Sequence, residues 1–143
     1  MTRLAPRSRA ICPARDRHRL AGRSRVALEE LADEEFIDFP SGYGNRAVTD
    51  RAFTRAGLRR HVTIEIAAIG AGADFVRHRM GVALLPRGST GHDIDLVSLP
   101  VTGADLDWPI SLATPSNRAP SAAARAPSAA ARAFEHLVDQ HLR

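Results

Sequence analysis

The stretch Phe36–Asp50, FIDFPSGYGNRAVTD, joins a short apolar segment to a glycine-containing turn and then to a helical pattern. The apolar segment predicts a strand that Pro40 ends, and the loop SGYGN leads into a helix with Gly57 as its C-cap residue. Residues 61–67 then alternate apolar and polar side chains, which predicts a second strand with one face in the core. The stretch therefore predicts a β-loop-α-β unit. The apolar stripe expected on its helix consists of Val48, Ala52, Phe53 and Ala56.

The same pattern is repeated downstream in outline. Residues 68–80 open with glycines and predict a short helix, and residues 82–86, VALLP, are an apolar run typical of a buried strand. Two more strands are predicted within residues 95–101 and 107–115. Successive β-α-β steps imply a mostly parallel sheet flanked by helices, which is an α/β fold.

The charge of the chain is unevenly distributed. The chain has 143 residues, 44% of them hydrophobic, and a net charge of +4, and each of its 20 basic residues is Arg. Eight of these arginines lie in residues 1–25. Residues 1–17 are therefore predicted to be a basic, disordered arm, more typical of a solvated extension than of a phosphate-binding segment, and any DNA binding by it would be weak and independent of sequence. The apolar run Ala10–Cys12 is too short for an export signal, no run of about 18 apolar residues exists, and a cytoplasmic location is expected.

The polar residues do not form a recognisable catalytic or metal-binding pattern. Cys12 is the only cysteine, and His136 and His141 lie five residues apart, which does not match the spacing of a helical zinc pair. The pair Asp93 and Asp95 is more typical of a solvated turn than of a metal site. The sequence predicts a protein that is not an enzyme, with no cofactor and no metal.

A nucleotide-binding alternative comes from the glycine loop itself. Gly42, Gly44 and Ala47 fit the spacing G-x-G-x-x-A, and Glu65 lies about 20 residues further on, as in dinucleotide-binding folds. In that fingerprint the glycines follow the strand directly, whereas here Pro40 and Ser41 intervene. A nucleotide-binding enzyme fragment therefore stays an alternative interpretation of the loop.

Four segments, taken in order, resemble the regulatory domain of LysR-type transcriptional regulators. Residues 18–58 are similar to the phrase HPLAGR-x-x-V-x-LEDLADEPFI and the loop and helix that follow it in that family, and residues 72–86, GADFVRHRMGVALLP, to the family's helix ending in VAAGLGVALLP. Residues 96–101 resemble its next strand, and residues 107–138 its closing strand and C-terminal helix. The likeness extends from about His18 to Val138.

The resemblance implies a periplasmic-binding-protein-like (type II) domain that holds a small effector between two lobes and passes the signal to a DNA-binding winged helix. The 17 residues before His18 cannot contain that winged helix or most of a first lobe, so the chain is expected to be truncated to the C-terminal half. DNA would be bound only through a winged helix absent from this chain. The expected partners are a small-molecule effector and a second copy of the chain, and a degenerate interaction module is a further alternative.

The predicted effector site lies in two loops that open helices. A glycine-containing loop at a helix start exposes backbone N–H groups, and the helix dipole adds partial positive charge, so such a loop can hold a carboxylate. In the resembled family the loops corresponding to Pro40–Asn45 and Ala68–Ala71 face the cleft. Trp108 and Phe36 are expected to be core or lobe-contact residues. The effector-binding residues predicted in this way are Pro40, Ser41, Gly42, Tyr43, Gly44, Asn45, Ile69 and Gly70.

The C-terminal segment changes character. Residues 118–131 read RAPSAAARAPSAAA, a tandem copy of a seven-residue unit in which proline interrupts helix formation. The predicted organisation is a lobe at 18–114, a connection at 115–127 and an amphipathic helix at 128–143. With most of the first lobe missing, the apolar face of this helix is expected to drive self-association. That face consists of Phe134, Leu137, Val138 and Leu142.

Overall fold

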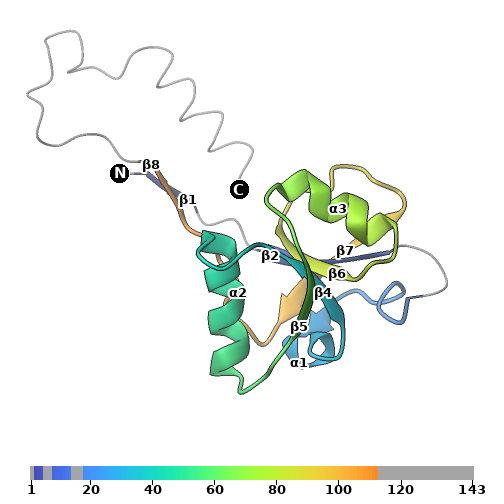
Figure 1. Cartoon of the computed structure of the whole chain (residues 1–143), viewed down its shortest axis with the longest axis horizontal. Helices are drawn as coiled ribbons and strands as arrows, with labels where there is room; N and C mark the ends of the chain where they lie inside the picture. The colour runs from blue at the N-terminus through green and yellow to red at the C-terminus, as the bar shows by residue number, and fades with distance from the viewer. Residues whose placement is uncertain (1, 5–7, 14–17, 113–143) are drawn as a thin grey trace, which may run out of the picture. The chain divides into compact units, whose positions relative to one another are not determined.

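The computed structural model describes residues 2–4, 8–13 and 18–112, and the chain divides into two compact units. One unit consists of residues 1–6 and 109–143, and in it β1 (Thr2–Leu4) pairs with β8 (Ile110–Leu112) as an antiparallel ladder. The other unit, Arg7–Trp108, contains the remaining described helices and strands (Figure 1). The predicted connection, the tandem repeat and the C-terminal helix lie outside the described residues.

The larger unit is built on a six-stranded mixed sheet. The strand order is β3-β7-β2-β6-β4-β5. β2 runs antiparallel to its neighbours β6 and β7, whereas the pairs β3–β7, β4–β6 and β4–β5 are parallel. The predicted α/β fold is confirmed, and the sheet is mixed rather than mostly parallel because β2 runs antiparallel at its centre. The strands are β2 (Ser8–Pro13), β3 (Val26–Ala27), β4 (Glu35–Asp38), β5 (His61–Glu65), β6 (Val82–Pro86) and β7 (Leu96–Thr102).

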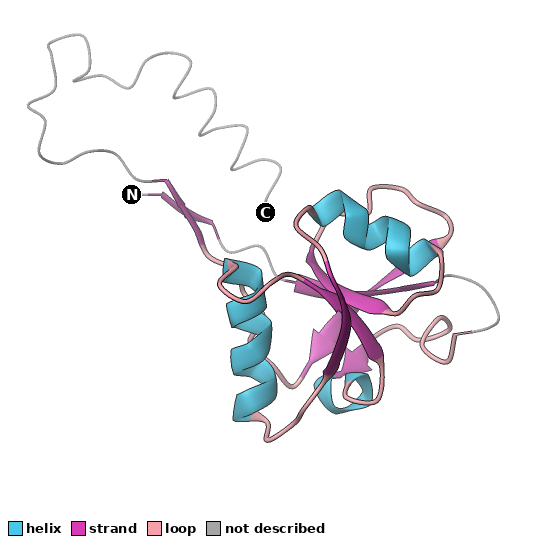
Figure 2. Cartoon of the chain, viewed as in Figure 1, coloured by secondary structure: helices cyan, strands magenta, loops and turns pink. Residues whose placement is uncertain are grey.

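Helices cover both faces of this sheet. The helices α1 (Leu28–Leu31) and α2 (Gly44–Arg55) lie on one face, and α3 (Ile69–Arg77) lies on the other (Figure 2). The strand order explains the arrangement. The chain moves from β4 to β5 through α2, then back past β4 to β6 through α3, and right-handed crossovers in opposite directions place their helices on opposite faces.

β2 corrects the expectation of a disordered arm over residues 1–17. Residues 8–13 form a central strand that pairs with β6 on one side and β7 on the other. Ala10 and Cys12 are buried in the core beneath α1 and α2, and Ile11 is buried in the core beneath α3. The short apolar run is therefore a strand with both faces covered, a position that requires apolar residues in succession rather than in alternation.

Arg9 shows how a basic residue is accommodated in this strand. Its Nε donates to Ser98 Oγ at 2.9 Å, and its Nη2 donates to the Ser98 carbonyl oxygen at 3.0 Å. Ser98 belongs to β7, the neighbouring strand. The guanidinium thus reinforces strand pairing, which the charge pattern alone did not indicate.

The end of α2 follows the prediction. Gly57 has φ +68°, its N–H donates to the Thr54 carbonyl at 3.0 Å, and the Leu58 N–H donates to the Phe53 carbonyl at 2.9 Å. These two hydrogen bonds form a Schellman motif, which satisfies the last carbonyls of the helix. The predicted apolar stripe is correct for Val48, Ala52 and Phe53, which are buried, and wrong for the C-cap residue Ala56, which is exposed.

β5 departs from the single buried face expected of it. The pairing of β4 with β5 shifts in register between Phe36, which lies opposite Val62, and Ile37, which lies opposite Ile64. Val62 therefore packs against the core beneath α1 and α2, and Ile64 packs against the core beneath α3. A bulge at the edge of a sheet re-aims side chains in this way.

Among the described residues, no helix is long and apolar enough to cross a membrane.

Candidate functional site

Two loops leave the sheet side by side at the carboxyl ends of neighbouring parallel strands. The first loop, residues 39–43, follows β4, and the second loop, residues 66–68, follows β5. The final residues of the two strands, Asp38 and Glu65, are paired in register, and the Ile66 N–H donates to the Asp38 carbonyl at 2.8 Å. Ligands of open α/β sheets bind at this edge, outside the carboxyl ends of the strands. The structure therefore brings the two predicted segments to one edge of the sheet, but Gly44 and Asn45 are the first residues of α2, and residues 69–71 the first residues of α3, rather than loop residues.

The predicted site residues differ in exposure. Asn45 is buried, and its Oδ1 accepts from the Arg46 N–H at 3.0 Å, so it serves the helix start from inside. Tyr43 is 42% exposed and stacks on the buried Phe39, with ring centroids 5.8 Å apart. Pro40 and Ile69 are half-buried, and Ser41, Gly42, Gly44 and Gly70 are exposed.

The first loop contains a tight turn that needs one of its glycines. The Tyr43 N–H donates to the Pro40 carbonyl at 3.3 Å, and Gly42, at the third position of this turn, has φ +96°. A type II turn requires a positive φ at that position, which glycine adopts without strain. The turn leaves Ser41 at the tip of the loop.

Both helices that follow the loops begin without a capping side chain. Tyr43 is the N-cap residue of α2 and Ala68 that of α3, and neither makes a side-chain hydrogen bond to its helix. The first N–H groups of a helix have no partner within the helix and attract negative charge. In α2 these are the N–H groups of Gly44 and Asn45. The two loops thus present two uncapped helix N-termini at one edge of the sheet.

An ion-pair network lies beneath the first loop. Arg60 and Asp38, each with a side chain that is only 5% exposed, form an ion pair, and Arg60 Nη1 also contacts Asp50 Oδ1 at 2.8 Å. Burial raises the pKa of Asp38, although the Phe39 N–H, Arg60 and Arg46 each lower it. The effect of burial on the pKa of Asp38 is therefore larger than the combined opposite effect of these partners.

Arg46, in the first turn of α2, is occupied by the same network. Its Nη1 donates to the Phe39 carbonyl at 2.7 Å and to Glu65 Oε1 at 3.3 Å, and its Nε lies 3.2 Å from Asp50 Oδ1. Arg46 therefore joins the start of the first loop to the end of β5. The sequence did not predict this role, because these partners share no helical or strand spacing.

Trp108 is a second residue of this region that was not predicted from the sequence to lie near the loops. A Cβ atom added to Gly44 would lie 3.1 Å from Trp108 Nε1, so the indole approaches the first residue of α2. Trp108 is half-buried and packs against the core beneath α1 and α2, as expected of a core residue. It nevertheless also borders the start of the helix that follows the first loop.

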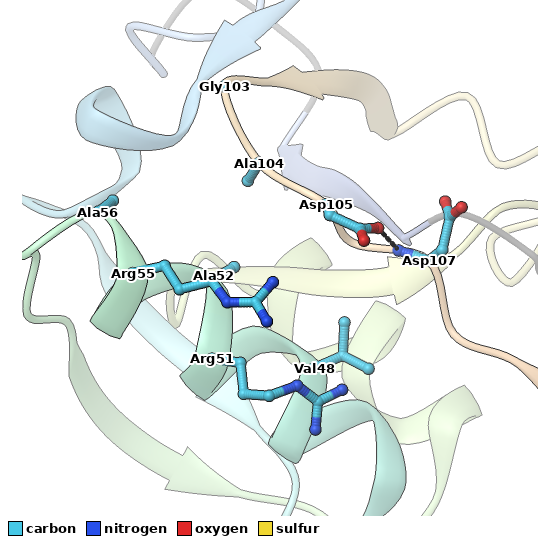
Figure 3. A pocket seen from close by; sticks show the side chains of 9 residues that line it. All are labelled: Val48, Arg51, Ala52, Arg55, Ala56, Gly103, Ala104, Asp105 and Asp107. Carbon is cyan, nitrogen blue, oxygen red and sulfur yellow. Dashed lines mark hydrogen bonds between the residues drawn. The ribbon is translucent and has the colours of Figure 1, made fainter.

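A separate cavity of about 190 Å³ lies further along α2. Arg51 and Arg55 extend from α2 on one side, and Asp105 and Asp107 lie on the segment that faces it (Figure 3). The Asp107 N–H donates to Asp105 Oδ1 at 3.1 Å. None of the eight predicted site residues lines this cavity. Its lining residues are Val48, Arg51, Ala52, Arg55, Ala56, Gly103, Ala104, Asp105 and Asp107.

The metal and nucleotide alternatives can be compared with this geometry. Among the described residues, no group of three or more His, Cys, Asp or Glu side chains is placed to hold a metal, and Asp93 is paired with Arg77. Five residues separate β4 from α2, and Gly44 is already the first helical residue. A dinucleotide fingerprint instead places its glycines directly after the strand.

The fold defines the class of the protein: an α/β, periplasmic-binding-protein-like domain with the fold of solved effector-binding and regulatory domains. The chain belongs to the LysR substrate binding domain family, whose model matches residues 2–138. The expected resemblance is therefore confirmed, and the match includes β2. The chain is 33% identical over 111 residues to the uncharacterized HTH-type transcriptional regulator YwbI of Bacillus subtilis. This match covers 75% of the chain and 36% of YwbI.

Two solved structures are similar in fold. The effector binding domain of QuiR in complex with shikimate superimposes with a TM-score of 0.78 at 20% identity, covering 98% of this chain and 65% of that one. The Synechocystis PCC6803 CcmR regulatory domain in complex with 2-PG gives a TM-score of 0.68 at 20% identity, covering 99% of this chain and 67% of that one. The chain spans about a third or less of the curated regulators that it matches.

Proposed function

We propose that the chain is the effector-sensing part of a LysR-family transcriptional regulator and that it binds a small organic anion at the two loops. The observation that carries the proposal is the position of two uncapped helix N-termini, each following a loop at the carboxyl ends of the neighbouring strands β4 and β5. Backbone N–H groups at such positions bind carboxylates and phosphates. In the full domain the ligand would lie in a cleft that a second lobe completes.

The side chains around the loops indicate how an anion would be held. Arg46 is engaged by Phe39, Asp50 and Glu65, so it is not the principal ligand of the anion. The N–H groups of Gly44 and Asn45 would bind the carboxylate, and the exposed Ser41 and Tyr43 would supply hydroxyl groups. Their contribution favours an anion that also carries hydroxyl or other polar groups.

The ligands bound in the two similar structures support this ligand class. The QuiR domain is described with shikimate and the CcmR domain with 2-PG. For the present chain we propose the class, a small organic anion, and no particular compound. Sequence-specific DNA binding and the effect on transcription would belong to a winged helix of the longer regulator. A second copy of the chain is the proposed protein partner.

Titration calorimetry tests the proposal with a panel of shikimate, 2-PG, acetate, succinate and citrate, compared with NAD and ATP. At least one anion should bind the wild-type chain more tightly than either nucleotide, and Ser41→Ala should weaken that binding. The double variant Arg51→Ala/Arg55→Ala is the matched control, because it alters the separate cavity on the same helix. Tight NAD binding that Gly42→Ala abolishes would favour the nucleotide alternative instead.

A loss of anion binding in the control variant would also contradict the proposal. Such a result would move the site from the two loops to the cavity between α2 and residues 103–107. Circular dichroism of each variant establishes whether its fold is intact. A variant that keeps the wild-type spectrum and loses binding has lost the site alone.

A further inference from the structure

Gly44 is a glycine that its own backbone conformation does not require. It is the first residue of α2, and it is not among the glycines with positive φ. Alanine is the better residue in a helix, since glycine has more backbone freedom to lose. The position does have a steric reason to lack a side chain, because a Cβ atom would lie 3.1 Å from Trp108 Nε1. The pair Gly44 and Trp108 is therefore best explained as one packing unit.

Trp108 also contacts the core of the lobe. Leu106, two residues before Trp108, is 1% exposed, and the Asp107 N–H donates to Asp105 Oδ1 at 3.1 Å. Trp108 itself packs against the core beneath α1 and α2. The side chain of Trp108 therefore contacts the core and also lies close to the first residue of α2.

Trp108 is also the last residue of the compact unit that contains the sheet. The chain continues into the other unit at Pro109. Gly44, on the other side of the contact, directly follows Tyr43, the last residue of the first loop. One side-chain contact thus joins the proposed effector loop to the point where the chain leaves the lobe.

We propose that Trp108 is a positioning residue of the effector site: it fixes the first turn of α2, and with it the first loop, and its environment changes when an anion is bound there. This inference rests on the proposed function. An anion bound by the N–H groups of Gly44 and Asn45 lies next to the indole, whose edge carries partial positive charge. Any displacement of Gly44 on binding is transmitted directly to Trp108.

The test uses the full chain, in which Trp108 is the only tryptophan, so that its emission reports this contact alone. The five anions of the calorimetric panel are titrated while tryptophan emission is followed, and the calorimetry is repeated with Trp108→Phe and Trp108→Ala. Emission should change with the same midpoint as the heat of binding. Trp108→Ala should weaken the affinity by about tenfold, whereas Trp108→Phe, which keeps an aromatic ring, should retain most of it.

Gly44→Ala supplies the reciprocal arm. The added methyl group must displace the indole, so the emission of Trp108 should shift in the absence of any anion and the affinity should fall. Gly22→Ala is the matched control, because a Cβ atom there meets nothing within 4 Å. It should leave both emission and affinity unchanged. Thermal unfolding of each variant separates loss of binding from loss of fold.

The outcomes distinguish this inference from the proposed function. If no anion of the panel binds the wild-type chain, the proposed function fails and this inference fails with it. If an anion binds, but Trp108→Ala and Gly44→Ala bind it as the wild type does and tryptophan emission stays constant, the inference is overturned and the proposed function stands. If Trp108→Ala no longer folds, the milder Trp108→Phe and the Gly44→Ala emission shift decide.

Discussion

The guanidinium of Arg60 pairs with the carboxylate of Asp38, the residue directly before the first loop, in an ion pair whose two side chains are each 5% exposed. The guanidinium carbon also lies 5.6 Å from the ring centroid of Phe36 and 5.4 Å from that of Phe53. Phe36 belongs to β4 and Phe53 to α2, so Arg60 connects the strand and the helix that enclose the loop. Removing Arg60 would leave the Asp38 carboxylate buried, with the Arg46 Nε at 3.8 Å as its remaining cation.

Arg60→Met should therefore destabilise the protein by about 3–5 kcal/mol at neutral pH, the usual cost of breaking a buried ion pair. Urea unfolding measures this difference. Arg59→Met, at an exposed neighbouring position, is the control and should stay within about 0.5 kcal/mol of the wild type. Equal stability of the two variants would show that the pair does not hold β4 and α2 together.

The loss of stability caused by Arg60→Met should also depend on pH. Burial already raises the pKa of Asp38, and loss of Arg60 removes one of the interactions that lower it. An acid whose pKa is raised by folding contributes stability at low pH that is lost as pH rises through the folded-state pKa. The deficit should therefore shrink as pH is lowered through the range in which Asp38 protonates. A deficit that grows in acid would contradict this sign.

Cys12 should be unreactive in the native protein. Burial, with a smaller effect of Glu34, raises the pKa of its thiol from 9.0 to about 11, so the thiolate is scarce at about pH 8. A thiol reagent such as DTNB should react slowly with the native chain and quickly after unfolding in urea. By linkage, the stability that the protonated thiol contributes should be lost as pH rises from about 9 to about 11. Reaction at the same rate in both states would contradict the burial.

Gly81→Ala should be severely destabilising. Gly81 has φ +146°, and a Cβ atom there would lie 2.5 Å from the Glu35 carbonyl oxygen. The combined strain and clash should cost at least about 2–3 kcal/mol. Gly70→Ala is the matched comparison, because Gly70 lies on α3 and a Cβ atom added there meets nothing within 4 Å. This variant should be more stable than the wild type by roughly 0.5–1 kcal/mol. Thermal unfolding gives both values, and similar midpoints for the two variants would contradict the prediction.

The central strand β2 provides a further test. Ile11 is 1% exposed beneath α3, so Ile11→Ala should cost about 2–5 kcal/mol. Arg25→Ala, at an exposed position, should be nearly neutral. Urea unfolding distinguishes this account from that of a disordered arm, in which Ile11→Ala would also be neutral.

The sequence predicted those parts of the fold whose signal is local. Residues 36–86 carry two successive β-α-β patterns, and the helix end at Gly57 has its own signature, so these elements were found where they were expected. β2 was missed because its partners, β6 and β7, are more than 70 residues away in the chain. A strand buried on both faces also shows no alternation of apolar and polar side chains, and the arginines around it suggested solvent.

For the candidate site, the sequence predicted the positions of the loops but not the contacts around them. Loop positions came from a family resemblance together with the physics of helix N-termini, and both loops lie at one edge of the sheet. The ion pair of Asp38 with Arg60 could not be predicted, because the two residues are 22 positions apart and no periodic pattern relates them. The contact of Trp108 with Gly44 joins still more distant segments. Contacts of this kind become visible only when the sheet has brought its strands together.

The most direct test of the central claim is a titration of the ¹⁵N-labelled chain with the anion that binds best in the calorimetric panel, followed by amide chemical shifts. The account predicts that the largest shifts fall on the two loops and helix starts, at Gly42, Gly44, Asn45 and Gly70, with the indole N–H of Trp108 shifting alongside them. Shifts concentrated at Arg51, Arg55 and residues 103–107, with the two loops unaffected, would contradict it.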